Sequence, residues 1–215
     1  MSGGQYVGDK MELKKALEEL RKGKERKFDQ SVDLIMNLKG VDIKRENIAI
    51  IIDVPYKVKD KKVCGFLTKK SDKIESVSEP DFAKYKDKKT LKRLVDGYDF
   101  FIAAAPLMPK VATTFGKVLG PAGKMPSPQL GILAQENDTA IQSVLDKISR
   151  SIKIRAKEPS IKVSIGRSKM DDTQIAENFE AVYRGIVNAL PTKKENVKNV
   201  MIKFTMSKPV KVEAK

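Results

Sequence analysis

Residues 116–128 spell GKVLGPAGKMPSP, which places three glycines and three prolines within thirteen positions. Glycine permits positive φ angles and close backbone approach, whereas proline fixes φ and removes an amide donor. The stretch is therefore predicted to be a rigid, irregular loop between two helices. Its backbone amides, together with Lys117 and Lys124, are expected to be available to phosphate.

Two common phosphate-binding templates do not fit this loop. The P-loop needs a serine or threonine after Gly123 and Lys124 and a glycine five residues before Gly123, but the chain has Met125 and Val118 there. The dinucleotide fingerprint G-x-G-x-x-G is also missing from it. The residue types leave two interpretations open: a rigid connector inside an α/β domain, or a basic loop in contact with a polyanion.

The charge of the chain favours a polyanionic partner. Its 215 residues carry a net charge of +15, and the pI is near 9.7. Nucleic acid suits this charge better than anionic lipid does. No apolar run approaches the ~20 residues of a membrane span, and the N-terminal MSGGQYVGDK lacks the apolar core of a secretory signal. We expect a cytoplasmic protein with no membrane partner.

The cysteine and histidine content argues against most catalytic classes. Cys64 is the single cysteine, so the chain can form neither an internal disulfide nor a cysteine metal site. Its neighbours in VCGFL predict a small buried apolar residue. Histidine is absent, which removes the commonest general base and metal ligand. We expect no metal and no cofactor.

The first sixty residues show regular apolar spacing. The pattern predicts an amphipathic helix over residues 10–22, a half-buried strand over residues 32–38 and a more buried strand over residues 48–55. Residues 56–62, YKVKDKK, have no periodicity. They are expected to link two domains.

Strands and helices then alternate, as is typical of parallel βαβ units with right-handed crossovers. The expected order is a strand over residues 63–67, a charged helical region through Tyr85, a helix over 90–96, a strand over 99–106, a helix over 110–118, the glycine- and proline-rich loop, a helix carrying Ile141, Val144, Leu145 and Ile148, and a strand over 151–157.

The pattern breaks at Glu158 and Pro159 and continues as a strand over residues 161–167, a helix over 173–190 and a strand over 200–206. Each terminal piece has one long helix and about two strands, which is too little apolar surface for a core. Two arrangements stay open: terminal pieces that fold together around an inserted domain, or three consecutive small units.

GKVLGPAGKMPSP resembles the G-[KR]-[IV]-L-G-P-x-G-x-[ML]-P-x-P signature of the L-one family of large-subunit ribosomal proteins, and the whole chain lines up with that family in order. The resemblance implies an α+β first domain made of residues 1–59 and 158–215. A Rossmann-like α/β domain, residues 60–157, is inserted between hinges near Lys59 and Glu158. The lack of histidine and the short C-terminus are similar to archaeal members.

The same resemblance implies where RNA binds. Lys27-Phe28-Asp29 is similar to the family's K-F-D segment, and Thr205-Met206 to the start of its T-M-G-P-S-V segment. The implied first-domain contacts are Lys27, Phe28, Arg167, Thr205, Met206, Ser207 and Lys208, with Lys169 extending the basic rim. Secondary RNA contacts in the loop are expected at Lys117, Gly120, Gly123 and Lys124.

Several of these residues have a second interpretation. Phe28 beside a strand and Met206 within an apolar pattern are also typical of core residues. Ser207, Lys208 and Pro209 stand where the family has glycine, proline and serine. A close backbone approach at Ser207 is therefore less expected, and Lys208 is expected to contribute a phosphate contact instead.

Two functions from different classes follow. The first is a non-enzymatic ribosomal protein that binds large-subunit rRNA at the exit-site stalk, assists release of deacylated exit-site tRNA and represses translation by binding its own mRNA, all as the family resemblance implies. Such a protein is expected to be monomeric when free and otherwise ribosome-bound. The second is a nucleotide-binding α/β enzyme that uses the glycine-rich loop.

Overall fold

The computed structural model describes residues 5–23, 26–42, 46, 48–69, 71, 73–85, 87–156 and 158–212. Backbone contacts divide the chain into two compact units. Unit 1 consists of residues 1–59 and 150–215, and unit 2 of residues 60–149. Lys157, at the expected second domain boundary, lies outside the described residues. Residues 43–45, in an expected loop of the first domain, lie outside them as well.

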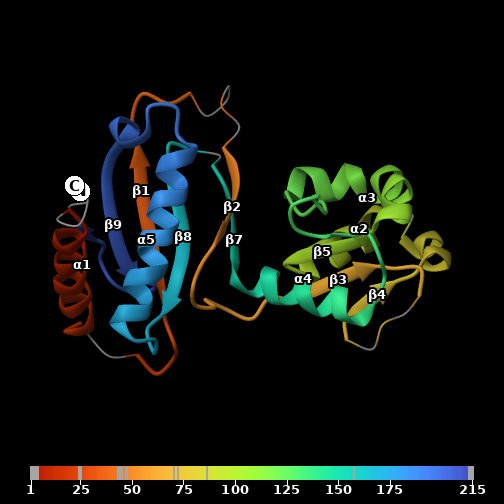
Figure 1. The fold of residues 1–215 in the computed structure, drawn as a ribbon, viewed down its shortest axis with the longest axis horizontal. Helices are drawn as coiled ribbons and strands as arrows, with labels where there is room; N and C mark the ends of the chain where they lie inside the picture. The colour runs from red at the N-terminus through yellow and green to blue at the C-terminus, as the bar shows by residue number, and fades with distance from the viewer. Residues whose placement is uncertain are drawn as a thin grey trace. The chain divides into compact units, whose positions relative to one another are not determined.

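Unit 1 is built on an antiparallel sheet with the strand order β10-β9-β1-β8. Its central strand, β1 (Ser31–Leu38), alternates strictly between half-buried and buried residues, as predicted from the apolar spacing. The strands beside it come from the far end of the chain: β8 (Ser160–Arg167), β9 (Val197–Phe204) and β10 (Val210–Val212). The terminal pieces of the chain therefore share one sheet (Figure 1).

Two helices cover the buried face of this sheet. α1 (Gln5–Arg21) contacts β9 and β10, and α5 (Asp172–Ala189) contacts β8 and crosses the sheet (Figure 1). Their apolar stripes meet the inward-facing residues of β1 in a single core. The members of that core with no exposed surface include Leu17, Val32, Leu34, Met36, Ile165, Ile175, Val182, Ile186 and Ile202.

A second, two-stranded ladder belongs to the same unit. β2 (Ala49–Asp53) pairs antiparallel with β7 (Ser151–Arg155), from Ala49 opposite Arg155 to Asp53 opposite Ser151. The expected domain boundary at Glu158 is therefore wrong, because the strand placed in the inserted domain lies in unit 1, which resumes at Arg150. β2 is also less buried than expected, with only Ile52 fully inside. A short 3-10 helix, η3 (Lys193–Asn196), precedes β9.

Unit 2 contains a parallel sheet with the strand order β4-β3-β5-β6. The strands are β3 (Val63–Phe66), β4 (Glu75–Val77), β5 (Phe100–Ala104) and β6 (Ile132–Leu133). The helices are α2 (Lys88–Gly97), α3 (Met108–Ala122) and α4 (Asp138–Arg150), with 3-10 turns η1 (Glu79–Tyr85) and η2 (Ala105–Leu107). The expected alternation of strands and helices is confirmed, except that β4 and η1 replace the predicted charged helix before Tyr85.

Aromatic side chains fill the core of unit 2. The ring of Phe66 stacks on Phe101 at 5.6 Å between centroids and lies 4.8 Å from Phe115, which in turn meets the edge of Phe82 at 5.1 Å. Cys64 is buried in the same core, as predicted. Burial, reinforced by the negative charge of Glu75, raises the pKa of its thiol to about 12. The thiol therefore stays protonated at neutral pH.

The glycine- and proline-rich stretch is not the continuous loop that was predicted. α3 runs through Gly116, Gly120 and Pro121 and ends at Ala122. Gly123 then takes a left-handed conformation (φ 69°) and donates its amide to the carbonyl of Gly120, while the amide of Lys124 bonds to Leu119. This is a common helix stop that favours glycine. Only the second half of the stretch, from Gly123 onward, is a loop.

Candidate nucleic-acid interface

Three loops meet at one end of the sheet in unit 1. β1 runs antiparallel to β8 and β9, with Ser31 opposite Arg167 and Val32 opposite Phe204. The start of β1 therefore lies beside the ends of both neighbours. The loops at that end include residues 26–30, 168–171 and 205–209, and together these hold every residue predicted for the first-domain RNA contact except Arg167, which ends β8.

A groove of about 640 Å³ opens between these loops. Of the predicted first-domain contacts, Lys27, Phe28, Met206, Ser207 and Lys208 line it, and Lys169 lines it as well. Arg167 and Thr205 are immediate chain neighbours of lining residues. The described residues that line it are Leu20, Arg21, Gly23, Arg26, Lys27, Phe28, Asp29, Gln30, Ser168, Lys169, Phe204, Met206, Ser207 and Lys208.

Phe28 and Met206 are the large apolar residues that the described part of unit 1 exposes. Phe28 is 52% exposed and Met206 59% exposed. Their alternative interpretation as core residues is therefore wrong. A flat aromatic ring and a flexible thioether in one groove present an apolar surface that a ribose or an unstacked base can cover.

The loop that carries Met206 is fixed by hydrogen bonds to the start of β1. The Thr205 hydroxyl accepts a bond from the amide of Ser31 at 3.0 Å and contacts its hydroxyl at 3.0 Å. The amide of Met206 donates to the side-chain oxygen of Gln30 at 3.1 Å, and the Ser207 hydroxyl accepts from the amide of Phe204 at 2.8 Å. Thr205 and Ser207 thus use their hydroxyls to hold the loop that presents Met206.

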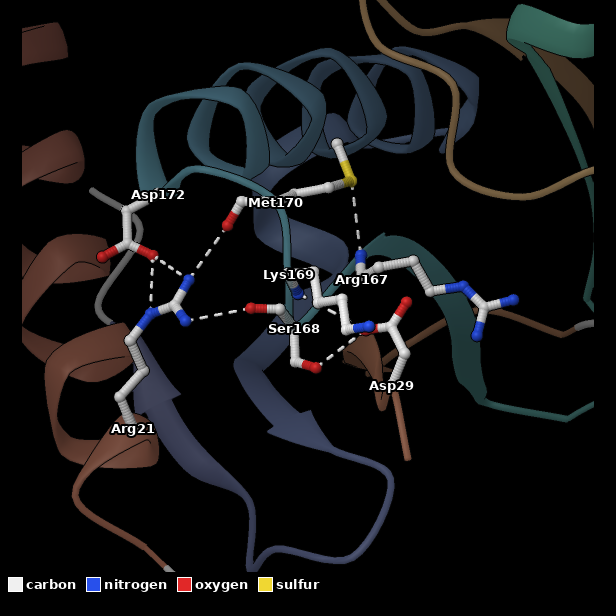
Figure 2. Close-up of polar contacts among 7 residues, drawn as sticks. All are labelled: Arg21, Asp29, Arg167, Ser168, Lys169, Met170 and Asp172. Carbon is white, nitrogen blue, oxygen red and sulfur yellow. Dashed lines mark hydrogen bonds and ion pairs between the residues drawn. The ribbon is translucent and has the colours of Figure 1, made fainter. Parts of the chain in front are cut away.

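Arg21 holds the loop between β8 and α5 (Figure 2). Its guanidinium donates to the carbonyl of Ser168 at 2.9 Å and to the carbonyl of Met170 at 3.0 Å. The same group donates to one carboxylate oxygen of Asp172, at 2.6 and 2.9 Å. The planar fork of arginine suits several acceptors at once. The end of α1 is thereby tied to a loop about 150 residues away.

Asp29 ties this loop to the segment that carries Phe28 (Figure 2). The Ser168 hydroxyl donates to the carboxylate of Asp29 at 2.9 Å, and the amide of Lys169 lies 3.4 Å from the same oxygen. Two bonds between Gln30 and Ser168 reinforce the contact: the amide of Ser168 donates to the carbonyl of Gln30, and the amide of Gln30 donates to the hydroxyl of Ser168. The Asp29 carboxylate is therefore directed at its neighbours in the protein.

The electrostatics of the groove are strongly positive. Its described lining includes five cations, and Asp29 is the acidic residue among the described lining residues. The cations are Arg21, Arg26, Lys27, Lys169 and Lys208. Within the part of the chain that the structure describes, only Arg21 of these cations forms an ion pair with a carboxylate. The other cations surround an apolar surface and are available to phosphate. This combination suits RNA backbone better than an apolar ligand.

The predicted secondary contacts in unit 2 differ in exposure and in role. Lys124 directs its ammonium to the carbonyls of Val95 and Tyr98, at 2.7 and 2.8 Å, where it caps the end of α2. Gly123 serves as the stop of α3. Lys117 and Gly120 are exposed on the helix itself. Lys124 thus has a structural role, and Lys117 keeps the side chain that is accessible to RNA.

Sequence reasoning missed the residues that hold the loops, namely Arg21, Gln30 and Ser168. Their partners are separated by about 140 to 175 residues in the chain, so no local spacing marks them. Among the described residues, no cluster of acidic or cysteine side chains has the makeup of a metal site. The described helices include none with the length and apolarity of a membrane span.

Comparison with known proteins places these observations in a family. The model of the ribosomal protein L1p/L10e family matches residues 20–208. The protein "Large ribosomal subunit protein uL1" of Thermococcus kodakarensis is 34% identical, with 95% of this chain and 98% of that protein aligned. The proteins of the same name from Archaeoglobus fulgidus (34%, covering 96% and 99%) and Pyrobaculum neutrophilum (35%, covering 94% and 93%) are similarly related. The chain therefore belongs to the ribosomal protein L1p/L10e family and resembles its archaeal members, as the sequence motifs predicted.

Proposed function

We propose that this protein is a structural component of the large ribosomal subunit that binds large-subunit rRNA through the groove in unit 1. The observation that carries this proposal is the exposure of Phe28 and Met206 in one groove lined by Arg26, Lys27, Lys169 and Lys208. An exposed aromatic ring and an exposed thioether are costly on a free surface unless a partner covers them. The surrounding cations favour a polyanion as that partner.

The groove suits a structured RNA more than a naked duplex. A-form RNA hides its bases in a deep major groove, and proteins recognise it by shape, sugar and phosphate contacts or at unstacked bases. Three loops joined by hydrogen bonds supply the shape, and Phe28 supplies a flat contact. Because hydrogen bonds to Gln30 and Asp29 hold the loops in advance, less conformational entropy is lost on binding.

Unit 2 is proposed to act as the moving part of the exit-site stalk. In this proposal unit 1 anchors to rRNA, while unit 2, a Rossmann-like insertion attached through two hinge segments, follows the stalk and assists the release of deacylated tRNA. An mRNA segment folded like the rRNA site would bind the same groove, so the protein would also repress its own translation. These roles place it on cytoplasmic ribosomes, as a monomer when free.

The alternative, a nucleotide-using enzyme, does not agree with the family. The ribosomal protein L1p/L10e family consists of structural, non-enzymatic proteins, as predicted from the sequence. The hollow of unit 2, about 790 Å³, also lies at the amino ends of β3 and β4, where Val63 and Glu75 line it. Parallel sheets bind nucleotides at the carboxyl ends of their strands.

Binding to purified large-subunit rRNA tests the proposal. The full chain is titrated against a fragment that contains the stalk base and, in parallel, against an unrelated structured RNA of equal length. We expect the stalk fragment to bind at least about tenfold more tightly, which corresponds to about 1.4 kcal/mol. Equal affinity for both RNAs would show that the charge of the chain, rather than the groove, accounts for binding.

A further inference from the structure

A second cluster of cations faces a hollow on the other side of unit 1. Lys153 and Arg155 of β7 and Lys162 of β8 line a trough of about 310 Å³. Glu158 is the acidic residue among the described lining residues, and Ser160 is also part of the lining. Three cationic side chains thus line a trough whose described lining includes one carboxylate.

The strand registers place these cations away from the helices. Ile52 of β2 and Ile154 of β7 point into the core, and Ile52 lies against Gly185 of α5. Because side chains alternate along a strand, Lys153 and Arg155 occupy the opposite face. In the main sheet Lys162 lies opposite Ile35, whose neighbours Leu34 and Met36 are the residues that face the core. Lys162 therefore also lies on the helix-free side.

The trough arises because β7 and β8 do not share a ladder. β7 pairs with β2, and β8 pairs with β1, although the two strands are neighbours in the chain (Figure 1). The amide of Ala156 donates to the carbonyl of Ile48, just before β2, and the amide of Leu38 in β1 donates to the carbonyl of Pro159. The connection between β7 and β8 is therefore bonded to the first ladder at one end and to the main sheet at the other. Side chains of β7, of β8 and of the connection between them line the trough.

The positive charge of Lys153 carries an electrostatic cost in the folded protein. Desolvation, followed by repulsion from Arg155, lowers the pKa of Lys153. Because the pKa of the Lys153 amine is lower in the folded chain than in the unfolded chain, the protonated amine destabilises the folded state at neutral pH. This destabilisation disappears only when the pH rises above the pKa of the unfolded chain. An anion in the trough would remove this cost, because it favours the protonated amine.

We propose that the trough lined by Lys153, Arg155 and Lys162 binds phosphate groups of an RNA backbone, as a contact separate from the groove at Phe28. Lys162 and Arg167 are five residues apart on β8, which corresponds to about 17 Å along the strand. The trough therefore contacts a different stretch of the RNA from the groove. This inference rests on the proposed function, because the RNA that fills the groove supplies the phosphates.

The test uses the full chain with Lys153→Gln and Lys162→Gln, singly and together. The matched control is Lys14→Gln, an exposed lysine on α1, which covers the opposite face of the sheet. The dissociation constant for large-subunit rRNA is measured at several salt concentrations. Each lost phosphate contact should lower the log-log slope by about 0.7, so the double variant should lose about 1.4. At 0.1 M salt each loss corresponds to about fivefold weaker binding.

Melting temperatures separate binding from folding. Lys153→Gln should melt at the same temperature as the unsubstituted chain or higher, because a repelled charge has been removed. Weaker binding without loss of stability supports the trough. A slope and affinity equal to those of Lys14→Gln would overturn it, and so would a fall in affinity that a lower melting temperature fully explains.

Two further measurements distinguish the failures. Phe28→Ala should weaken rRNA binding with an unchanged salt slope, because it removes no charge. If that holds while the lysine variants bind as the control does, the groove stands and the trough is overturned. If the unsubstituted chain has no preference for rRNA, the proposed function fails and the trough inference fails with it. A titration with inorganic phosphate alone should leave the Lys153 amine signal unmoved; saturation at millimolar phosphate would overturn the RNA-backbone assignment in favour of a small-anion site.

Discussion

Replacing Arg21 by alanine should loosen the loop between β8 and α5 and weaken RNA binding together. The substitution removes two hydrogen bonds to loop carbonyls, at 2.9 and 3.0 Å, and the ion pair with Asp172. The paired side chains are 39% and 33% exposed, so solvent screens the pair and it contributes about 0.5 kcal/mol. The two carbonyl bonds contribute about 0.5 to 1 kcal/mol each. The sum is about 1.5 to 2.5 kcal/mol.

This loss should lower the melting temperature by about 3 to 10 °C. Binding measured well below the transition should also weaken, by roughly fivefold, because a mobile loop must be ordered before Lys169 contacts phosphate. Arg21→Lys should behave much like Arg21→Ala, since a single ammonium cannot reach Asp172 and both carbonyls at once. Thermal unfolding followed by circular dichroism and an rRNA binding isotherm measure the two effects.

Arg184→Ala is the matched control. Arg184 pairs with Glu180 one turn earlier on α5, and this exposed pair contributes about 0.5 kcal/mol; its loss should leave rRNA affinity unchanged. If Arg21→Ala melts and binds as Arg184→Ala does, Arg21 does not hold the loop. Full stability combined with lost affinity would instead make Arg21 a direct RNA contact.

Phe28→Ala and Met206→Ala should each weaken rRNA binding by about 1 to 3 kcal/mol with unchanged melting temperatures. A lower melting temperature would indicate that the two side chains stabilise the fold instead of contacting RNA. Lys27→Ala should lower the salt slope by about 0.7, whereas Lys124→Met should lower the melting temperature and leave the slope unchanged, because its ammonium caps α2. The native Cys64 thiol, with a pKa raised to about 12, should resist iodoacetamide at pH 8 and react only in denaturant; rapid native alkylation would contradict its burial.

The elements that were predicted correctly from the sequence are those whose apolar residues recur with the spacing of one buried face. β1 alternates along its whole length, and α5 places Ile175, Phe179, Val182 and Ile186 on one buried face. Both patterns survive because one side of each element meets the core and the other meets solvent.

In the glycine- and proline-rich stretch, residues 116–128, local composition led to a wrong prediction of secondary structure. Its glycines and prolines suggested a loop, yet the helical stripe of Val111 and Phe115 continues into its first half at Leu119, and all three are fully buried. Pro121 lies in the last turn, close to the natural end of the helix. Burial of the stripe outweighed the low helix propensity of glycine.

The second domain boundary was misplaced for a different reason. Residues 151–155 have a strand pattern that fits either unit, and only the pairing with β2, about 100 residues earlier, assigns them to unit 1. Similarly, the family motif identified Phe28 and Met206 as contacts, but the hydrogen bonds that hold their segments join distant parts of the chain: Ser168 donates to Asp29, and the amide of Met206 donates to Gln30. Long-range partners of this kind leave no local signal in one sequence.

The central claim is that unit 1 carries the rRNA site by itself. The chain runs out of unit 1 after β2 and returns at β7, and these two strands are paired, with Asp53 opposite Ser151 and the amide of Val54 donating to the carbonyl of Arg150. A short glycine-serine bridge can therefore replace residues 60–149. We predict that the bridged protein melts cooperatively and keeps most of the affinity of the full chain for large-subunit rRNA, because Lys27, Phe28, Met206 and Lys208 are all retained. A cooperatively folded product that no longer prefers this rRNA would contradict the account and move the site into unit 2.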